Sequence, residues 1–302
     1  MTPTAATPFR IGTRASPLAL AQAEMAKAAL CAAHGWTSVA VQLVPMLSSG
    51  DKDQSRPLAE IGGKALWTKE LERALIDGDI DVAVHSMKDV ETVRPDTFHI
   101  AAMLSRADVR DRLIGADSIL SLPPSALVGT SSPRRAAQLK AMRPDLRTAP
   151  IRGNVATRMS KVANGEFAAT LLAAAGLDRL GLADTGAAIA TGEMLPAASQ
   201  GAIGIDCLSA RSDLTPVLDA INHAETFACV MAERAFLEEL SGNCHSPVAA
   251  LALVKDGGVW LSGQILSEDG SESISGEGDD PVALAQQLLA QASPALKALF
   301  SA

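Results

Sequence analysis

The sequence lacks several features that mark particular classes of protein. Its 302 residues include no tyrosine, aromatic residues make up 3%, and the net charge is −8. Nucleic-acid-binding proteins usually combine a broad basic surface with aromatic stacking platforms, so nucleic acid is not expected as a partner. No run of eighteen apolar residues occurs, and the first ten residues have neither a basic start nor an apolar stretch. We therefore expect no membrane span and no export signal.

The spacing of the four cysteines excludes two further kinds of structure. They form no C-x-x-C or Cys/His ligand pattern, so neither a disulfide framework nor a metal site is predicted, and a reducing cytoplasm is the expected location. Cys31, Cys207 and Cys229 fall in apolar segments, as small buried side chains do. Cys244 alone lies in a loop-like segment, residues 240–247. A loop cysteine is more often inert than reactive, but Cys244 is the best candidate for chemistry.

Apolar strand patterns and helical periodicities alternate along most of the chain. Buried strands are predicted at 39–44, 80–85, 167–173 and 202–207, and helices at 17–33, 68–77, 133–142 and 155–163. This alternation predicts an α/β fold. After about residue 224 the pattern changes to a helix over 223–240, strands near 248–254 and 259–266, a polar loop over 267–280, and a helix from about 281 with Pro294 inside it. This tail predicts a small separate α+β domain.

Two segments of the chain, residues 9–18 and 126–135, resemble each other. Each consists of a short strand, a Gly-Thr turn and a Ser-Pro pair that opens a helix. Such a helix start presents backbone N–H groups at the carboxyl end of a strand, where α/β sheets bind ligands. Arg14, Arg134 and Arg135 add positive charge at these turns. The two turns predict anion sites, although two unrelated βα units could also look alike.

A basic segment lies within this acidic protein. Between Thr130 and Arg179 there are nine Lys or Arg residues and three Asp or Glu residues. This excess indicates either a site for a small anionic ligand or a solvated helix face.

Two other segments have residues suited to chemistry. The buried strand at 80–85 runs into Lys88 and Asp89, and strand ends of this kind carry active sites in α/β proteins, although a solvated turn pair would look the same. Residues 50–64 form a long polar stretch with glycines near its end, which is typical of a lid or of a plain surface loop.

Seven segments in this order resemble the porphobilinogen deaminase family, also called hydroxymethylbilane synthase. They are residues 11–19, 62–64, 84–89, 128–135, 151–158, 200–204 and the loop of Cys244. The resemblance implies an α/β protein of three domains, of which the first two are like periplasmic binding proteins with a cleft between them. Domain 1 would comprise 1–105 and 200–221, domain 2 would comprise 106–199, and a small C-terminal α+β domain would comprise 222–302.

The resemblance also implies an activity. The family is a transferase of tetrapyrrole biosynthesis that joins four porphobilinogen molecules head to tail, releases ammonia and yields hydroxymethylbilane. It carries a dipyrromethane cofactor on a loop cysteine through a thioether, here Cys244. A cytoplasmic monomer without nucleic-acid or membrane partners is expected.

Site residues follow from the matched motifs. Asp89 matches the catalytic carboxylate, which would stabilise positive charge that develops on the substrate. The cofactor is implied to bind Lys88, Asp89, Ser131, Arg134 and Arg135. The substrate is implied to bind Arg14, Ser16, Lys64, Thr130, Ser132, Arg152, Arg158, Arg179 and Gln200. Arginine suits the acetate and propionate groups of pyrroles because its planar fork binds carboxylates bidentately and keeps its charge.

The chain departs from the family pattern at a few positions. Pro133 and Glu60 replace a common leucine and lysine, Trp67 replaces a phenylalanine, and Asn243 and His245 flank the cysteine. Glu60 weakens the expectation of a cationic lid. Two other functions remain open: a non-catalytic binding protein for a small polycarboxylate, and a thiolate hydrolase or transferase that uses Cys244 with His245.

Overall fold

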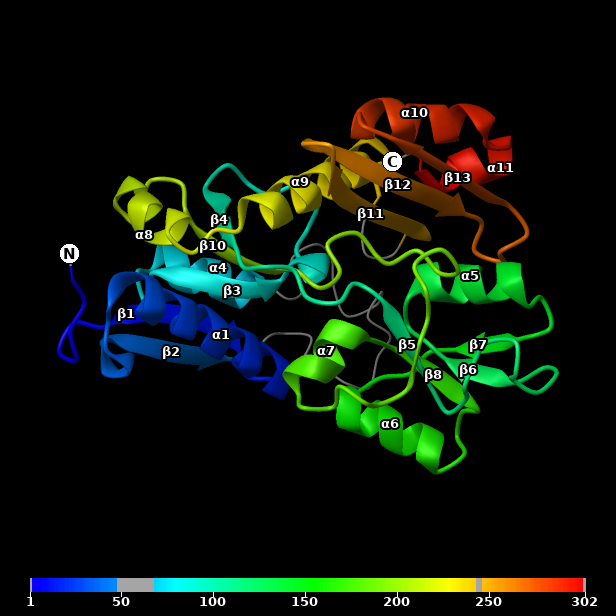
Figure 1. Ribbon diagram of the computed structural model, residues 1–302, viewed down its shortest axis with the longest axis horizontal. Helices are drawn as coiled ribbons and strands as arrows, with labels where there is room; N and C mark the ends of the chain where they lie inside the picture. The colour runs from blue at the N-terminus through cyan, green and yellow to red at the C-terminus, as the bar shows by residue number, and fades with distance from the viewer. Residues whose placement is uncertain (1, 48–67, 243–245, 301–302) are drawn as a thin grey trace. The chain divides into compact units, whose positions relative to one another are not determined.

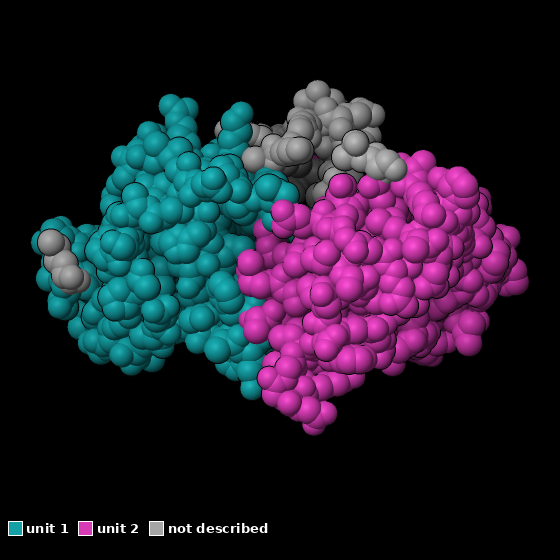
Figure 2. Space-filling model, turned by 90° about the horizontal axis from the view of Figure 1, so that it is seen from above, with its two compact units in different colours: residues 1–107, 202–227 teal, residues 108–201, 228–302 magenta. Residues whose placement is uncertain are grey.

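The computed structural model describes residues 2–47, 68–242 and 246–300. The chain divides into two compact units, residues 1–107 with 202–227 and residues 108–201 with 228–302 (Figure 2). The described residues form two five-stranded sheets and one three-stranded sheet, with helices packed against them (Figure 1). The predicted α/β class, with two sheet-rich parts and a small C-terminal sheet, is confirmed.

The first unit contains a sheet of strand order β2-β1-β3-β10-β4. Its strands are β1 (Phe9–Arg14), β2 (Val41–Met46), β3 (Val82–Ser86), β4 (Phe98–Met103) and β10 (Ile203–Leu208). Its helices are α1 (Pro17–His34), α4 (Lys69–Ile76) and α8 (Thr215–Asp219), with short 3-10 turns η1 (Ser38–Ala40), η2 (Met87–Asp89) and η3 (Ser212–Leu214). Strand β1 is parallel to β2 and β3, whereas β10 is antiparallel to β3 and β4.

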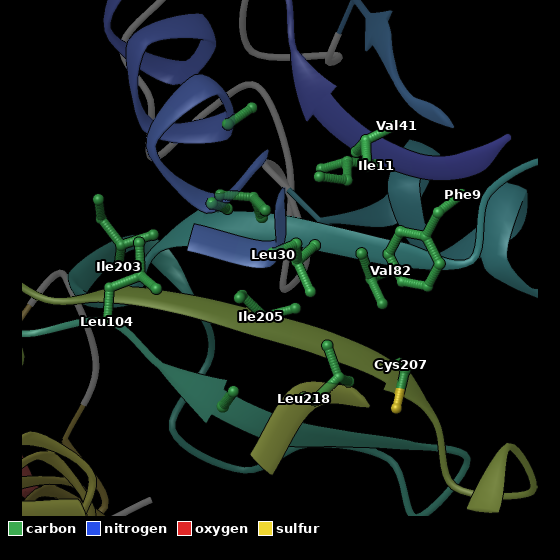
Figure 3. Close-up of a cluster of buried hydrophobic side chains, with 14 of the residues drawn as sticks. Phe9, Ile11, Leu30, Val41, Val82, Leu104, Ile203, Ile205, Cys207 and Leu218 are labelled. Carbon is green, nitrogen blue, oxygen red and sulfur yellow. The ribbon is translucent and has the colours of Figure 1, made fainter. Parts of the chain in front are cut away.

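Aliphatic side chains from this sheet and from α1 form the core of the first unit. Ile11, Leu30, Val82 and Ile205 are fully buried and lie in one cluster (Figure 3). Burying each side chain of this size stabilises the fold by roughly 1.5–3 kcal/mol. The core holds the strands in register and so places the turns at their carboxyl ends.

The second unit repeats this topology in a sheet of order β7-β6-β8-β5-β9. Its strands are β5 (Asp111–Ile114), β6 (Leu127–Gly129), β7 (Arg147–Ala149), β8 (Ala169–Ala173) and β9 (Ala187–Ala188), and its helices include α5 (Pro133–Met142), α6 (Val155–Ala163) and α7 (Ala174–Arg179). Strand β6 is parallel to β7 and β8, and β5 is antiparallel to β8. In each sheet the second strand of the order, β1 or β6, thus has two parallel neighbours, and the third strand, β3 or β8, pairs on its other side with an antiparallel strand.

The C-terminal region adds an antiparallel sheet of β11 (Val248–Lys255), β12 (Gly258–Leu266) and β13 (Ser273–Gly278). Helices α9 (Ala224–Glu239), α10 (Pro281–Gln291) and α11 (Pro294–Lys297) accompany it, with η4 (Ala298–Phe300) at the end. The division between the two units falls within α9. The region has its own buried cluster, which includes Phe236 and Leu288, but it belongs to the same compact unit as residues 108–201. The three-domain division therefore stays a prediction.

Two sequence predictions for this region are wrong. The expected loop over 267–280 contains strand β13, which pairs with β12 along its length and packs Gly276 under Leu284 and Leu288. Its polar residues misled the prediction because an edge strand exposes alternate side chains. Pro294 does not lie inside a helix but begins α11, where the Ser293 hydroxyl accepts a hydrogen bond from the Leu296 N–H at 3.2 Å.

No helix in the described part of the chain is long and apolar enough to cross a membrane.

Candidate functional site

The turn from β1 to α1 has the structure that its sequence predicts. Ser16 is the N-cap of α1, its hydroxyl accepts a hydrogen bond from the Ala19 N–H at 3.3 Å, and Pro17 is the first helical residue. The buried Thr13 hydroxyl donates to the Ala19 carbonyl at 3.1 Å. The turn is therefore tied to the first turn of the helix.

The turn from β6 to α5 repeats this arrangement in the second unit. Ser132 is the N-cap of α5, and its own N–H donates to the hydroxyl of Thr130 at 3.1 Å. The Ser131 hydroxyl donates to the carbonyl of Ile151 at 2.8 Å and accepts from its N–H at 3.2 Å. Ser131 thereby joins the start of α5 to the segment that carries Arg152.

A pocket in the first unit lies where β1 and β3 end. These strands are parallel neighbours, so their carboxyl ends lie at one edge of the sheet. Arg14 ends β1, and Asp89 lies in η2 directly after β3. The residues that line the pocket are Arg14, Ser16, Leu18, Ala19, Gln22, Val84, His85, Ser86 and Asp89. The structure thus brings three predicted site residues, Arg14, Ser16 and Asp89, into one pocket.

Gln22 is a pocket residue that the sequence reasoning missed. Its side-chain amide donates to the Ser86 hydroxyl at 2.7 Å, and the hydroxyl can donate back to the amide oxygen at 3.1 Å. Gln22 is 2% exposed and lies on the buried face of α1 beside Ala19, Ala23 and Ala26. A polar residue on an otherwise alanine-rich buried face was the available signal.

A buried carboxylate that the sequence reasoning also missed organises the predicted arginines of the second unit. Asp111 of β5 pairs with Arg134 at 2.8 Å and with Arg135 at 2.7 Å, and all three side chains are at most 9% exposed. The side-chain amide of Gln200 donates to Asp111 at 2.9 Å and to the Val109 carbonyl at 2.8 Å. Three residues predicted as ligand contacts therefore converge on Asp111.

Charge pairing determines the ionisation of this cluster. Burial alone would raise the pKa of Asp111, but the guanidinium groups of Arg134 and Arg135 outweigh it and hold the pKa well below its usual range. Burial lowers the pKa of Arg134, although Asp111 opposes that effect. The cluster is thus two cations around one anion.

Other predicted arginines lie at helix ends of the second unit. Asn154 caps α6 by accepting from the Thr157 N–H at 2.9 Å, and the Arg158 Nε donates to the Gly153 carbonyl at 2.9 Å. Arg152, like Arg158, is half-buried beside this cap. Arg179 at the end of α7 donates to the Gly201 carbonyl at 2.6 Å, and burial lowers its pKa to about 10.

The remaining predicted residues differ in how far the structure describes them. Lys88 is half-buried in η2 beside Asp89. Lys64 and Cys244 lie outside the described residues, as does Glu60. The predicted site residues that the structure describes therefore offer guanidinium groups, hydroxyls and helix N-termini. Carboxylate groups bind donors of these kinds.

Solved structures similar to this chain include two binding proteins. One is the second substrate binding domain of a putative amino acid ABC transporter from Streptococcus pneumoniae, with 12% identity and a TM-score of 0.42 over 76% of this chain and 93% of that one. Another is an ancestral arginine-binding protein, with 16% identity and a TM-score of 0.39 over 71% of this chain and 90% of that one. Scores this low support no inference about ligands.

Curated relatives are far more similar. A porphobilinogen deaminase of Sphingopyxis alaskensis is 55% identical over 97% of this chain and 97% of its own length. A porphobilinogen deaminase of Paracoccus denitrificans is 47% identical, with 91% of this chain and 89% of that protein covered. One from Chromobacterium violaceum is 44% identical, with 92% and 90% covered.

Two family descriptions match nearly the whole chain. "Porphobilinogen deaminase, dipyromethane cofactor binding domain" matches residues 9–216, and "Porphobilinogen deaminase, C-terminal domain" matches residues 227–296. These matches include the two Ser-Pro turns, the Asp89 pocket and the Asp111 cluster. The chain therefore belongs to the porphobilinogen deaminase family.

Proposed function

We propose that the pocket at the carboxyl edge of β1 and β3 is where this chain activates its substrate, with Asp89 as the catalytic carboxylate. As a member of its family, the chain is a hydroxymethylbilane synthase: it joins four porphobilinogen molecules into the linear tetrapyrrole and releases ammonia. One observation carries the assignment of the site. Arg14 and Asp89, which are far apart in sequence and opposite in charge, line the same pocket.

The two charges suit the two ends of the substrate. Arg14 and the Ser16 hydroxyl offer cationic and polar donors to the acetate and propionate groups. Asp89 offers a negative charge to the pyrrole N–H and to the positive charge that develops when ammonia leaves. A carboxylate fixed beside developing positive charge favours the transition state more than the ground state, which is the requirement for catalysis.

The described donors also fit the dipyrromethane cofactor, whose side chains are again carboxylates. Lys88 beside Asp89 supplies an ammonium donor in the first unit, and the exposed Ser131 at the start of α5 supplies a hydroxyl in the second. The guanidinium of Arg135 already donates to Asp111 and to the Leu171 carbonyl. We assign the covalent attachment to Cys244. When bound there, the cofactor supplies the pyrrole to which the first substrate molecule is joined.

The intact mass of the purified protein tests this assignment. Wild type should exceed its polypeptide mass by a two-pyrrole adduct, and the denatured protein should colour with Ehrlich's reagent, which detects pyrroles. Cys244→Ser should show the bare mass, no colour and no turnover of porphobilinogen. Cys31→Ser, which changes a half-buried cysteine of α1, is the matched control and should keep both adduct and activity.

The same measurements separate the alternative functions. A wild-type protein of bare mass that binds porphobilinogen without consuming it would be a binding protein, which the family match does not favour. Alkylation of Cys244 in the native wild type would indicate a free thiol rather than a thioether. The cytoplasmic location, the monomeric state and the absence of nucleic-acid partners stay predictions.

A further inference from the structure

A buried ionic cluster surrounds Arg94 in the first unit. Arg94 donates to Asp206 of β10 at 2.6 Å, to Glu91 at 3.2 Å and to Glu72 of α4. The Arg94 side chain is 8% exposed and that of Asp206 is fully buried. The Arg94 guanidinium also lies over the ring of Phe98, 5.3 Å from its centroid.

His85 connects this cluster to the pocket. It belongs to β3, lines the pocket with Asp89, and has a side chain only 5% exposed. Its Nε2 lies 3.6 Å from the Asp206 carboxylate, which is beyond hydrogen-bond distance, and has no hydrogen-bond partner among the described residues. Asp206 therefore stands between two candidate cations, Arg94 and His85, and binds Arg94.

We propose that Arg94 is a positioning residue for the Asp89 pocket: it occupies the Asp206 carboxylate, which would otherwise pair with His85 and place an imidazolium in the pocket lining. The proposal rests on the proposed function, in which Asp89 works as an anion. An imidazolium in the same pocket lining would offset the negative charge of Asp89. A neutral imidazole leaves that charge available to the substrate.

The groups around His85 have opposing effects on its ionisation. Burial lowers the pKa of His85 most strongly, Asp206 raises it, Arg94 lowers it, and Glu72 and Glu91 raise it. On the pocket side, Arg14 and Asp89 share the lining with His85. Arg94 is the cation that opposes three carboxylates, so its removal shifts this balance toward protonated His85.

Titration of His85 by NMR tests the proposal without any measurement of enzyme activity. In wild type, the His85 resonance, assigned by its loss in His85→Asn, should titrate below the usual range for histidine. In Arg94→Met the midpoint should rise by at least about one pH unit. In the double variant Arg94→Met, Asp206→Asn it should return toward the wild-type value. The matched control is Arg10→Met, which removes another Arg–Asp pair of the same unit and should leave His85 unchanged.

A second variant covers the case in which Arg94→Met does not fold. Arg94→Lys keeps the charge, but its single nitrogen cannot take the place of both Nη1, which binds Glu72 and Glu91, and Nη2, which binds Asp206, so the His85 midpoint should shift in the same direction by a smaller amount. If a folded Arg94→Met or Arg94→Lys variant titrates His85 at the wild-type midpoint, the proposal is overturned.

Activity provides an independent readout. Turnover of Arg94→Met should fall as the pH drops through the raised His85 midpoint. The pH profile of wild type should lack this fall in turnover, and His85→Asn in the Arg94→Met background should abolish it. An Arg94→Met enzyme whose pH profile matches wild type despite a shifted His85 would also overturn the positioning role. If no variant and no wild type turned over porphobilinogen, the proposed function would fail while the NMR result still stood.

Discussion

Asp111 and Arg135 form an ion pair of 2.7 Å in which the carboxylate is fully buried and the guanidinium is 9% exposed. Arg134 pairs with the same carboxylate at 2.8 Å, so two cations share one anion and the cluster keeps one net positive charge. Both arginines thus have a structural partner before any ligand binds. The surplus charge lies at the N-terminus of α5, where it adds to the helix dipole in attracting carboxylate groups.

Asp111→Asn should destabilise the protein by about 3–5 kcal/mol, because it leaves two buried guanidinium groups without a counter-charge. Urea unfolding of purified wild type and variant measures the difference. Asp145→Asn is the control, since it breaks an Arg143–Asp145 pair at 2.7 Å on the surface and should change the stability far less. Equal stabilities for wild type and Asp111→Asn would mean that the ion pairs contribute nothing to folding.

The contribution of Asp111 should depend on pH in a defined direction. Arg134 and Arg135 depress the folded-state pKa of Asp111. The stability that Asp111 contributes is therefore fully present above the unfolded-state pKa of about 3.9, and it is lost as the pH falls toward the folded-state pKa. The stability difference between wild type and Asp111→Asn should therefore be constant from about pH 5 to 8 and shrink below about pH 4. Urea unfolding across this pH series checks it, and a difference that grows on acidification would contradict the ionised state of Asp111.

Asp89→Asn should bind substrate but turn it over about two to three powers of ten more slowly, because the amide keeps the shape and loses the charge. Asp89→Glu keeps the charge but moves it, so it should retain more activity than the Asn variant. The rate of hydroxymethylbilane formation measures both, with the cofactor checked by intact mass in each variant. Near-normal turnover by a cofactor-loaded Asn variant would show that Asp89 is not the catalytic carboxylate.

Arg152→Leu and Arg134→Leu should have different effects because the two side chains have different surroundings. Arg152 is half-buried beside the N-cap of α6, so its loss should impair turnover or stall elongation with partial chains attached while thermal unfolding changes little. Arg134 is buried against Asp111, so its loss should lower stability by several kcal/mol, about the cost of breaking a buried pair. Native mass spectrometry after limited porphobilinogen, together with thermal unfolding, separates the two effects. Identical behaviour of both variants would contradict this distinction.

Local patterns in the sequence were enough to predict the elements that carry the candidate site. The Ser-Pro pairs at Ser16 and Ser132 predicted helix starts, and the strand that ends before Asp89 predicted a turn; both helix starts and the turn are present, while the catalytic role of Asp89 stays a prediction. These features depend on capping, on the fixed φ of proline and on strand alternation, which involve neighbours within a few residues. The boundaries shifted by one or two residues, as at β2, which begins at Val41 after the η1 turn.

Only the tertiary structure decided which charges meet. Arg94 and Asp206 are 112 residues apart and pair because β10 enters the first sheet between β3 and β4, a strand order that no local pattern encodes. Asp111 binds Arg134 and Arg135 because β5 runs antiparallel beside β8 and faces the start of α5. In the sequence these arginines indicated an anionic ligand, since an unpaired cation and one already paired with a distant carboxylate look the same. Because these side chains are buried, each pairing affects the stability of the protein: a charge removed from water requires a partner, and only the fold supplies it.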